Sequence, residues 1–229
     1  PAADFFGSFN LSVTAPTTET SNSATATNSP AETIAVNVSA VADTPSVTDV
    51  STNEDVQTNS GLVVTPNAND AASVTHFQVT GITGGTLFQA DGTTQINNND
   101  FITTAQGAAG LKFTPTANSD ANGSFQVHAT TTGDAVGLAG SLATGNITVT
   151  AVADAPTVAV TPASGNEDTA INLSITPNLV DTDSSESITA VTISSIPVGA
   201  TLDNTGNDVP AIVGGSVTLT VAQLVGLNI

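Results

Sequence analysis

Residues 33–47 read TIAVNVSAVADTPSV, and residues 146–158 repeat most of this stretch as NITVTAVADAPTV. In both copies Val, Ile and polar residues alternate, and the alternation ends in an Asp-x-Pro step. Alternation with a period of two places apolar side chains on one face of an extended chain, as in an antiparallel strand with one wet face. The stretch therefore predicts a strand that leads into a stiff connection, present twice in the chain.

Other phrases recur at nearly the same spacing. GSFNLSVTA (7–15) matches GSFQVHATT (123–131), and NEDVQTNSGLVVTPNAND (53–70) matches NEDTAINLSITPNLVD (166–181) with a small difference in length. TTAQGAAGLKF (103–113) resembles LTVAQLVGLNI (219–229). Copies lie about 110–116 residues apart, which is the size of one β-sandwich module. Only AQGAAG and AQLVG suggest even a helical turn. We therefore expect an all-β fold of tandem Ig-like sandwiches, with strands at these alternating residues: Phe9, Leu11 and Val13; Ile34, Val36 and Val38; Leu111 and Phe113; Phe125 and Val127; Ile147 and Val149; Ile171, Leu173 and Ile175; Val217, Leu219 and Val221.

The repeats also predict the domain organisation. Residues 44–154 form one complete repeat, residues 1–43 match its last third, and residues 155–229 match its first two thirds. The simplest expectation is a window cut from a longer array. In an alternative arrangement, the N-terminal part of one molecule completes the C-terminal part of the next by strand donation, which would produce a head-to-tail fibre.

The charge composition excludes several classes of partner. The chain of 229 residues has 20 acidic residues, one basic residue (Lys112) and no cysteine, with a formal net charge of −19. Binding to nucleic acid and electrostatic docking on anionic membranes both need many basic side chains. No apolar run approaches the roughly 18 residues of a membrane-spanning helix. We therefore expect neither nucleic-acid binding nor membrane insertion.

The near absence of bases also makes clusters of acids informative. Two carboxylates about 4 Å apart repel by roughly 4 kcal/mol at an effective dielectric constant of 20. Clustered acids must therefore stay solvated, take up a proton or share a cation. The acids that recur in both repeats lie in loops or at strand ends, where distant segments can converge at one pole of a sandwich.

These recurring acids are our candidate metal ligands. Calcium suits them, because it takes six to eight oxygen ligands in flexible geometry, whereas zinc and copper prefer His or Cys. The two histidines, His76 and His128, lie within alternating strand patterns and are not expected to be ligands. Asp4 aligns with Asp120 but is not included in the set. The candidate ligands are Asp43, Glu54, Asp55, Asp70, Asp120, Asp154, Glu167, Asp168, Asp181, Asp183 and Glu186.

The segment NEDTAINLSITPNLVDTDSSESITAVTISSIPVGATL (166–202), followed by LTVAQLVGLNI, resembles the cadherin-like tandem repeats of giant bacterial surface adhesins, many of them exported by type I secretion. The resemblance implies an Ig/cadherin-like sandwich with calcium at the junctions between repeats. It makes Asp43 and Asp154 the linker acids, Asn-Glu-Asp the early acids, and Asp181 with Asp183 an Asp-x-Asp pair. The middle repeat has Ala72 in place of the second acid, so the first junction is expected to bind fewer ions or none.

The expected function is that of a non-catalytic extracellular segment on a cell surface, a calcium-stiffened spacer or adhesive stalk whose partners are the neighbouring repeats. No nucleophile–base arrangement is readable, so we expect no enzyme. One alternative is a self-assembling filament or surface-layer subunit with homotypic contacts. Another is binding to cell-surface glycans through calcium.

Overall fold

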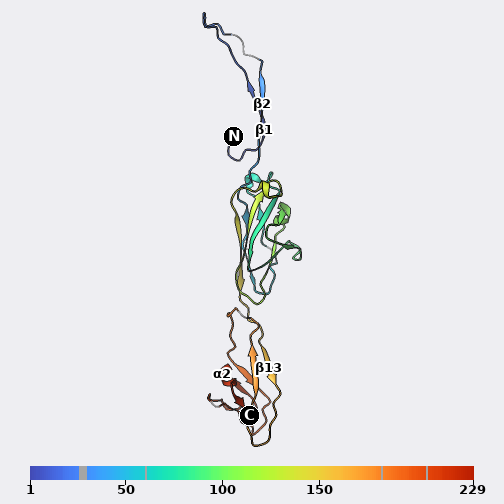
Figure 1. Cartoon of the computed structure of the whole chain (residues 1–229), viewed down its shortest axis with the longest axis vertical. Coiled ribbons are helices and arrows are strands. Elements are labelled where there is room, and N and C mark those ends of the chain that lie inside the picture. Colours follow the sequence, from blue (N-terminus) through green and yellow to red (C-terminus); the bar gives the residue numbers. More distant parts are fainter. Residues whose placement is uncertain (26–29, 60, 182, 205) are drawn as a thin grey trace. The chain divides into compact units, whose positions relative to one another are not determined.

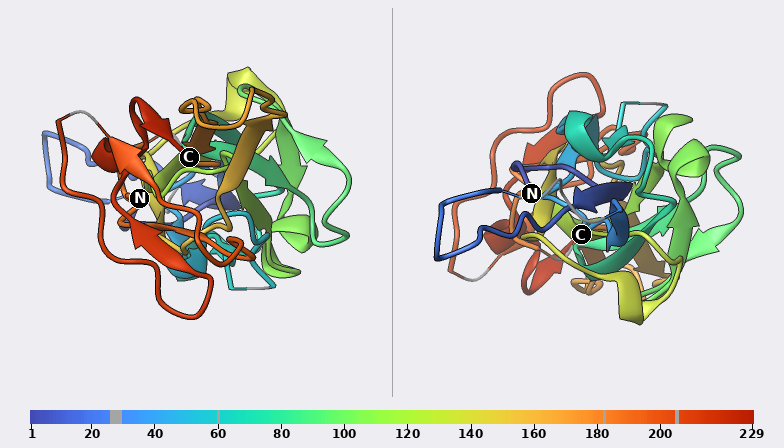
Figure 2. Two further views of the ribbon diagram at one scale, coloured as in Figure 1. Left: turned by 90° about the horizontal axis from the view of Figure 1, so that it is seen from below. Right: turned by 90° about the horizontal axis from the view of Figure 1, so that it is seen from above.

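The computed structural model describes residues 1–25, 30–59, 61–181, 183–204 and 206–229. The chain is mostly β, with 39% of residues in strands and 7% in helices. The ribbon consists of strands and loops with only short helical turns between them (Figures 1 and 2). The expected all-β class is therefore confirmed. Within the described ranges, no helix is long and apolar enough to cross a membrane.

Contacts between residues divide the chain into two compact units, each built from three segments. Unit 1 comprises 1–51, 57–114 and 122–148, and unit 2 comprises 52–56, 115–121 and 149–229. This grouping follows contacts and not chain order, so short segments near 54 and 118 join the C-terminal residues. The division into repeats at 44 and 154 stays a prediction.

The strands of the middle region form two larger sheets and one short pair. A five-stranded sheet has the order β4-β12-β11-β6-β9, and a three-stranded sheet has the order β10-β7-β8. The five-stranded sheet consists of β4 (Val50–Asn53), β12 (Ala143–Thr150), β11 (Gly123–Thr130), β6 (His76–Thr83) and β9 (Phe101–Thr103). The remaining strands are β10 (Lys112–Pro115), β7 (Gly85–Phe88), β8 (Gln95–Ile96) and the pair β3 (Ser46–Val47) and β5 (Val64–Thr65); short 3-10 helices span Ala68–Asp70 and Ala135–Gly137.

The core of unit 1 lies between the two larger sheets. Phe77 and Phe125 from the five-stranded sheet and Phe113 from β10 are all 0% exposed. The Phe113 ring lies so close to Gly123 that a Cβ added there would collide with it. Glycine at 123 therefore lets strand β11 approach the opposite sheet, and the alternating positions of β11 and β10 supply this core as the sequence pattern predicts.

A separate hairpin is formed by β1 (Gly7–Val13) and β2 (Glu32–Val38) (Figure 1). Its antiparallel register pairs Phe9 with Val36 and Leu11 with Ile34, so these side chains share one face. Ser8, Asn10 and Ser12 alternate with them on the other face. Phe9 is 38% exposed, Leu11 47% and Ile34 52%. The apolar face predicted from the alternation exists, but in the described chain it is largely open to solvent.

The C-terminal part of unit 2 consists of short two-stranded sheets. Its core contains Ile196, Val217, Leu219, Leu224 and Leu227, surrounded by partly buried Leu173, Ile175, Val191, Ile193 and Ile229. The pairs are β13 (Thr157–Thr161) with β14 (Ser174–Asn178), β15 (Val191–Ile193) with β17 (Val217–Leu219), and β16 (Asp203–Asn204) with β18 (Leu227–Asn228).

The two expected helical turns are present as α1 (Thr104–Ala108) and α2 (Val221–Leu224). Both begin with the same capping box, in which Thr103 pairs with Gln106 and Thr220 with Gln223. The predicted strand position at Val221 was wrong. Thr220 caps the helix at this point, so the strand ends at Leu219 and Val221 is the first helical residue.

Candidate cation site

The Asn-Glu-Asp motif forms the same turn in both copies. Asp55 has φ 57° and Asp168 has φ 60°, a left-handed conformation that Asp tolerates better than most residues. Asp55 also accepts a hydrogen bond from the backbone N–H of Asn118, at 2.9 Å. In the first copy the turn directly follows β4, which ends at Asn53, and in the second copy it comes several residues after the end of β13 at Thr161.

In the first copy, the glutamate of the motif is buried within unit 2. Glu54 is 2% exposed, and its Oε1 accepts a hydrogen bond from the backbone N–H of Val152 at 2.5 Å. The Glu54 N–H donates to the Thr150 carbonyl, so the turn is attached to the segment that leads to Asp154. The second oxygen, Oε2, has no hydrogen-bond partner among the described residues. Glu54 therefore carries a buried and incompletely satisfied carboxylate.

Asp181 is the second buried carboxylate of this site. It is 2% exposed, and neither of its oxygens has a hydrogen-bond partner in the part of the chain that the structure describes, which omits the adjacent Thr182. A buried carboxylate without donors is costly and normally takes up a proton or binds a cation. The two unsatisfied carboxylates come from segments 127 residues apart, 181 against 54 in the sequence.

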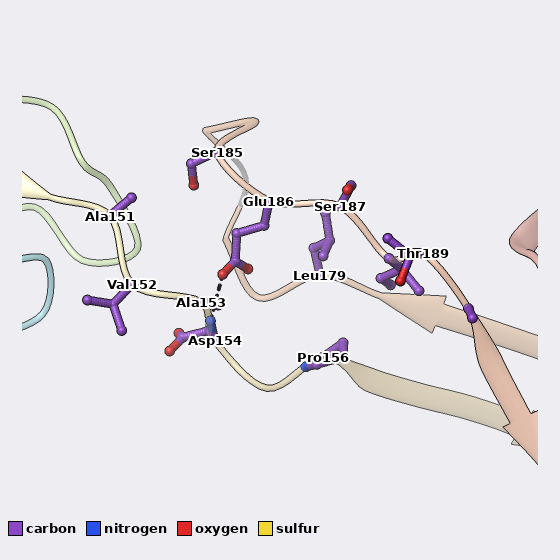
Figure 3. Close-up of a pocket in the computed structure, with 12 residues that line it drawn as sticks. Ala151, Val152, Ala153, Asp154, Pro156, Leu179, Ser185, Glu186, Ser187 and Thr189 are labelled. Carbon is purple, nitrogen blue, oxygen red and sulfur yellow. Dashed lines mark hydrogen bonds between the residues drawn. The ribbon is translucent and has the colours of Figure 1, made fainter.

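Three further acids surround this pair. The Glu186 carboxylate accepts a hydrogen bond from the Asp154 backbone N–H at 2.7 Å (Figure 3). Both residues line a pocket of about 420 Å³ between the loop 185–190 and the linker 151–154. The Asp183 carboxylate accepts from the N–H groups of Asp120 (3.0 Å) and Ser185 (2.9 Å). Asp120 thus contributes its backbone to the site, where it holds Asp183.

The electrostatics agree with this grouping. Burial, followed by the neighbouring charges of Glu54, Glu186, Asp154 and Asp183 in that order, raises the pKa of Asp181 to about 6. By contrast, the backbone N–H of Ser185, followed by its side chain and by the Asp120 N–H, lowers the pKa of Asp183. We call Glu54, Asp154, Asp181, Asp183 and Glu186 the unit 2 cluster.

The carboxylates of the unit 2 cluster do not form a ready-made metal site. Among the described residues, no three acidic or histidine side chains lie close enough together to hold one metal ion as they stand. Charge repulsion acts over longer distances than the 2.3–2.6 Å of calcium ligation. The neighbouring acids can therefore raise the pKa of Asp181 although they are too far apart to bind one ion together. Shared ligation of one ion therefore requires these carboxylates to come closer together. Carboxylate oxygens of this kind suit a hard cation such as calcium.

A second group of acids lies in unit 1. The Asp70 carboxylate, 3% exposed, accepts a hydrogen bond from the Asp43 backbone N–H at 2.5 Å. The Asp4 carboxylate accepts from the Asn69 side chain at 2.9 Å. The charge of Asp70, then burial and the charge of Asp4, raise the pKa of Asp43. We call Asp4, Asp43 and Asp70 the unit 1 cluster.

The structure therefore sorts the predicted ligands. The unit 2 cluster contains five of them: Glu54, Asp154, Asp181, Asp183 and Glu186. Asp43 and Asp70 belong to the unit 1 cluster. Asp55 forms a turn, and Asp120 donates its backbone N–H to Asp183. Glu167 and Asp168 are exposed, and no recorded contact groups them with the other acids of the described chain. Asp4 was missed as a candidate, although its alignment with Asp120 was the signal that would have found it. The two histidines lie in strands β6 and β11, as expected from their alternation.

Comparison with known proteins does not assign a family. No protein-family model matches the chain, and no curated protein sequence is significantly similar to it.

Proposed function

We propose that this chain is a non-catalytic, extracellular spacer segment of tandem Ig/cadherin-like β-sandwiches on a cell surface, and that calcium at the unit 2 cluster stiffens it. One observation carries the proposal: Glu54 and Asp181 are both buried, and three of their oxygens are unsatisfied among the described residues. Buried carboxylates without hydrogen-bond donors are costly. A cation shared by the two would remove their mutual repulsion and coordinate the unsatisfied oxygens.

The segments that meet at this cluster explain how an ion would act mechanically. Glu54 and Asp154 belong to the predicted repeat 44–154, and Asp181, Asp183 and Glu186 belong to the predicted repeat that follows. An ion held by both sets cross-links the end of one repeat to the first loop of the next. Without it, the like charges repel and favour an open, flexible connection.

Extracellular modules typically bind calcium with dissociation constants of about 10⁻⁴ to 10⁻³ M. This range suits a fluid with millimolar calcium and is far too weak for the cytosol. The composition agrees with the surface location, because a chain with one basic residue presents trypsin-like proteases with a single target.

Isothermal titration calorimetry of the whole chain with calcium tests the proposal. We expect saturable binding that Glu54→Gln weakens at least tenfold, because it removes one of the two unsatisfied charges while keeping the side-chain size. Asp203→Asn, a change of the same charge at an exposed strand residue of unit 2, is the matched control and leaves binding unchanged. Absence of calcium binding in the wild-type chain contradicts the proposal.

A further inference from the structure

We propose that Glu186 is a positioning residue of the unit 2 cluster. By accepting the linker N–H of Asp154, its carboxylate leaves the buried Asp181 carboxylate open to a cation. When Glu186 is removed, the same N–H is expected to donate to Asp181 instead. The effect of Glu186 on calcium rests on the function proposed above, whereas the choice of hydrogen-bond acceptor does not.

The unit 1 cluster shows which acceptor this donor takes when no other acid competes for it. In the two copies of the repeat, Asp43 corresponds to Asp154 and Asp70 corresponds to Asp181. The Asp43 backbone N–H donates to the Asp70 carboxylate, which is 3% exposed. The segment between Asp70 and strand β6, residues 71–75, contains no acid. In the absence of a competing acid, the linker N–H therefore satisfies the buried aspartate.

In unit 2 the corresponding segment is longer and contains two acids. Residues 182–190 separate Asp181 from strand β15 and include Asp183 and Glu186. The Asp183 carboxylate already accepts hydrogen bonds from two other backbone N–H groups. Glu186 accepts the Asp154 N–H at 2.7 Å, and Figure 3 shows its side chain directed at this linker nitrogen. Glu186 therefore competes with the buried aspartate for the linker donor.

Glu186 borders both the linker and the buried aspartate. It lines the pocket of about 420 Å³ that Asp154 also lines, and a second pocket of about 570 Å³ that Asp181 also lines. The two pockets share the stretch 186–188. After burial and the charge of Glu54, the charges of Glu186 and Asp154 raise the pKa of Asp181, so these residues lie near one another. One donor and two competing acceptors therefore meet in the same part of unit 2.

The competition decides how readily the buried aspartate can bind an ion. Asp181 is 2% exposed, and neither of its oxygens is hydrogen-bonded within the described ranges. A cation that binds these oxygens displaces no donor. If the linker N–H were donated to Asp181, an incoming cation would first have to break a hydrogen bond to a charged group, which weakens binding roughly ten- to a hundredfold. Glu186 thereby prevents Asp181 from becoming a satisfied aspartate of the unit 1 type.

Two substitutions at position 186 separate the hydrogen bond from the charge. Glu186→Gln removes the charge but keeps a side-chain oxygen that accepts the Asp154 N–H, whereas Glu186→Ala removes both. In chelator, NMR measurement of the scalar coupling across the hydrogen bond identifies the acceptor carbon of the Asp154 amide. We expect the side-chain carbonyl carbon of residue 186 in the wild type and in Glu186→Gln. In Glu186→Ala we expect the carboxyl carbon of Asp181.

Stability in chelator provides a second readout that loss of an ordinary contact would move in the opposite direction. Because the linker N–H changes its acceptor and is not lost, Glu186→Ala is expected to keep or raise the Tm of the wild type. Asp203→Ala removes an exposed acid of unit 2 and is the matched control for the loss of one negative charge. A Tm of Glu186→Ala clearly below that of Asp203→Ala overturns the exchange of acceptors.

Calorimetric titration of the same chains with calcium measures the consequence for ion binding. We expect Glu186→Ala to bind calcium at least tenfold more weakly than Glu186→Gln, because only the alanine variant frees the linker N–H to occupy Asp181. Asp203→Ala is expected to bind calcium as the wild type does. If the glutamine and alanine variants bind calcium equally weakly, Glu186 acts through its charge alone, and the positioning role is overturned.

The outcomes separate this inference from the proposed function. If the wild type binds no calcium, the proposed function fails, and the coupling measurement in chelator alone supports or overturns the exchange of acceptors. If the wild type binds calcium but the Asp154 amide of Glu186→Ala couples to no carboxyl carbon, the inference is overturned and the proposed function stands.

Discussion

The two acidic clusters are built from equivalent residues but differ in what satisfies the buried aspartate. In unit 1, Asp70 accepts a hydrogen bond from the linker N–H of Asp43. In unit 2, the linker N–H of Asp154 donates to Glu186, and Asp181 is left with two unsatisfied oxygens in the described chain. Glu186, one of the two acids that the second loop adds, thus takes the linker donor. One aspartate is satisfied within the protein, whereas the other is available to a cation.

This difference agrees with the expectation that the first junction is the weaker calcium site. The sequence argument rested on the missing acid at Ala72, and the structure adds a second physical reason, the donor already bound to Asp70. The clusters are therefore natural controls for each other.

The largest expected effect is the difference between the two clusters in how much calcium raises Tm. Calcium at ten to a hundred times its dissociation constant stabilises a binding unit by roughly 1–3 kcal/mol. For a unit of this size, that stabilisation raises Tm by about 5–15 °C. Asp181→Asn is expected to remove this rise, and Asp70→Asn to leave it, because Asn still accepts from the Asp43 N–H. Calorimetric melting curves in calcium and in chelator measure both. A rise lost in Asp70→Asn but retained in Asp181→Asn reverses the comparison.

A second prediction is that one substitution gives the unit 1 cluster the Asp-x-Asp pair of the unit 2 cluster. Ala72→Asp restores the Asp-x-Asp spacing and is expected to add one calcium site with a dissociation constant of about 10⁻⁴ to 10⁻³ M. Titration calorimetry measures the added site as an increase in stoichiometry. Ala71→Asp, the same charge one position earlier, is the control. If both variants bind calcium equally, net charge explains the binding and spacing does not.

The pH dependence should also differ between calcium and chelator. The pKa of Asp181 is raised to about 6 from an ordinary value near 4, so the folded state binds a proton more tightly than the unfolded state. In chelator, the stability of unit 2 is therefore highest below about pH 4 to 5 with respect to this group, and falls as pH rises through 6. Asp183, whose pKa is lowered, opposes this trend only below its ordinary value. Denaturant unfolding at pH 5 and pH 7 measures the difference, which Asp181→Asn is expected to remove.

The smallest expected effect concerns the Asn69 side chain, which donates to Asp4 in the unit 1 cluster. This bond is exposed, so Asn69→Ala is expected to cost no more than about 0.5–1 kcal/mol in the free energy of unfolding. The calcium response of unit 2 should not change. Urea unfolding checks the first statement, and a larger loss would indicate that the unit 1 cluster depends on this bond.

Much of the fold could be predicted from the alternation of apolar and polar residues, because a period of two is the period of a β-strand with one apolar face. The strands around Phe9, Ile34, Phe125 and Ile147 occur where the pattern predicts them. The pattern failed at Val221, where an apolar residue in phase with the strand is the first residue of a capped helix. An alternating pattern carries no information on the hydrogen bonds between Thr220 and Gln223 that begin the helix. The predicted strand therefore extended two residues beyond its observed end at Leu219.

By itself, the sequence determined the strand content, the recurrence of Asn-Glu-Asp and the types of acid available for a cation. These depend on local backbone preference and on chemistry that side chains carry everywhere. Only the tertiary structure decided which acids meet. Glu54 is eleven residues from Asp43 in the sequence but groups with Asp181, because the turn after β4 is attached to the end of β12. The choice of partner is a property of strand pairing across the whole repeat, and no local pattern contains it.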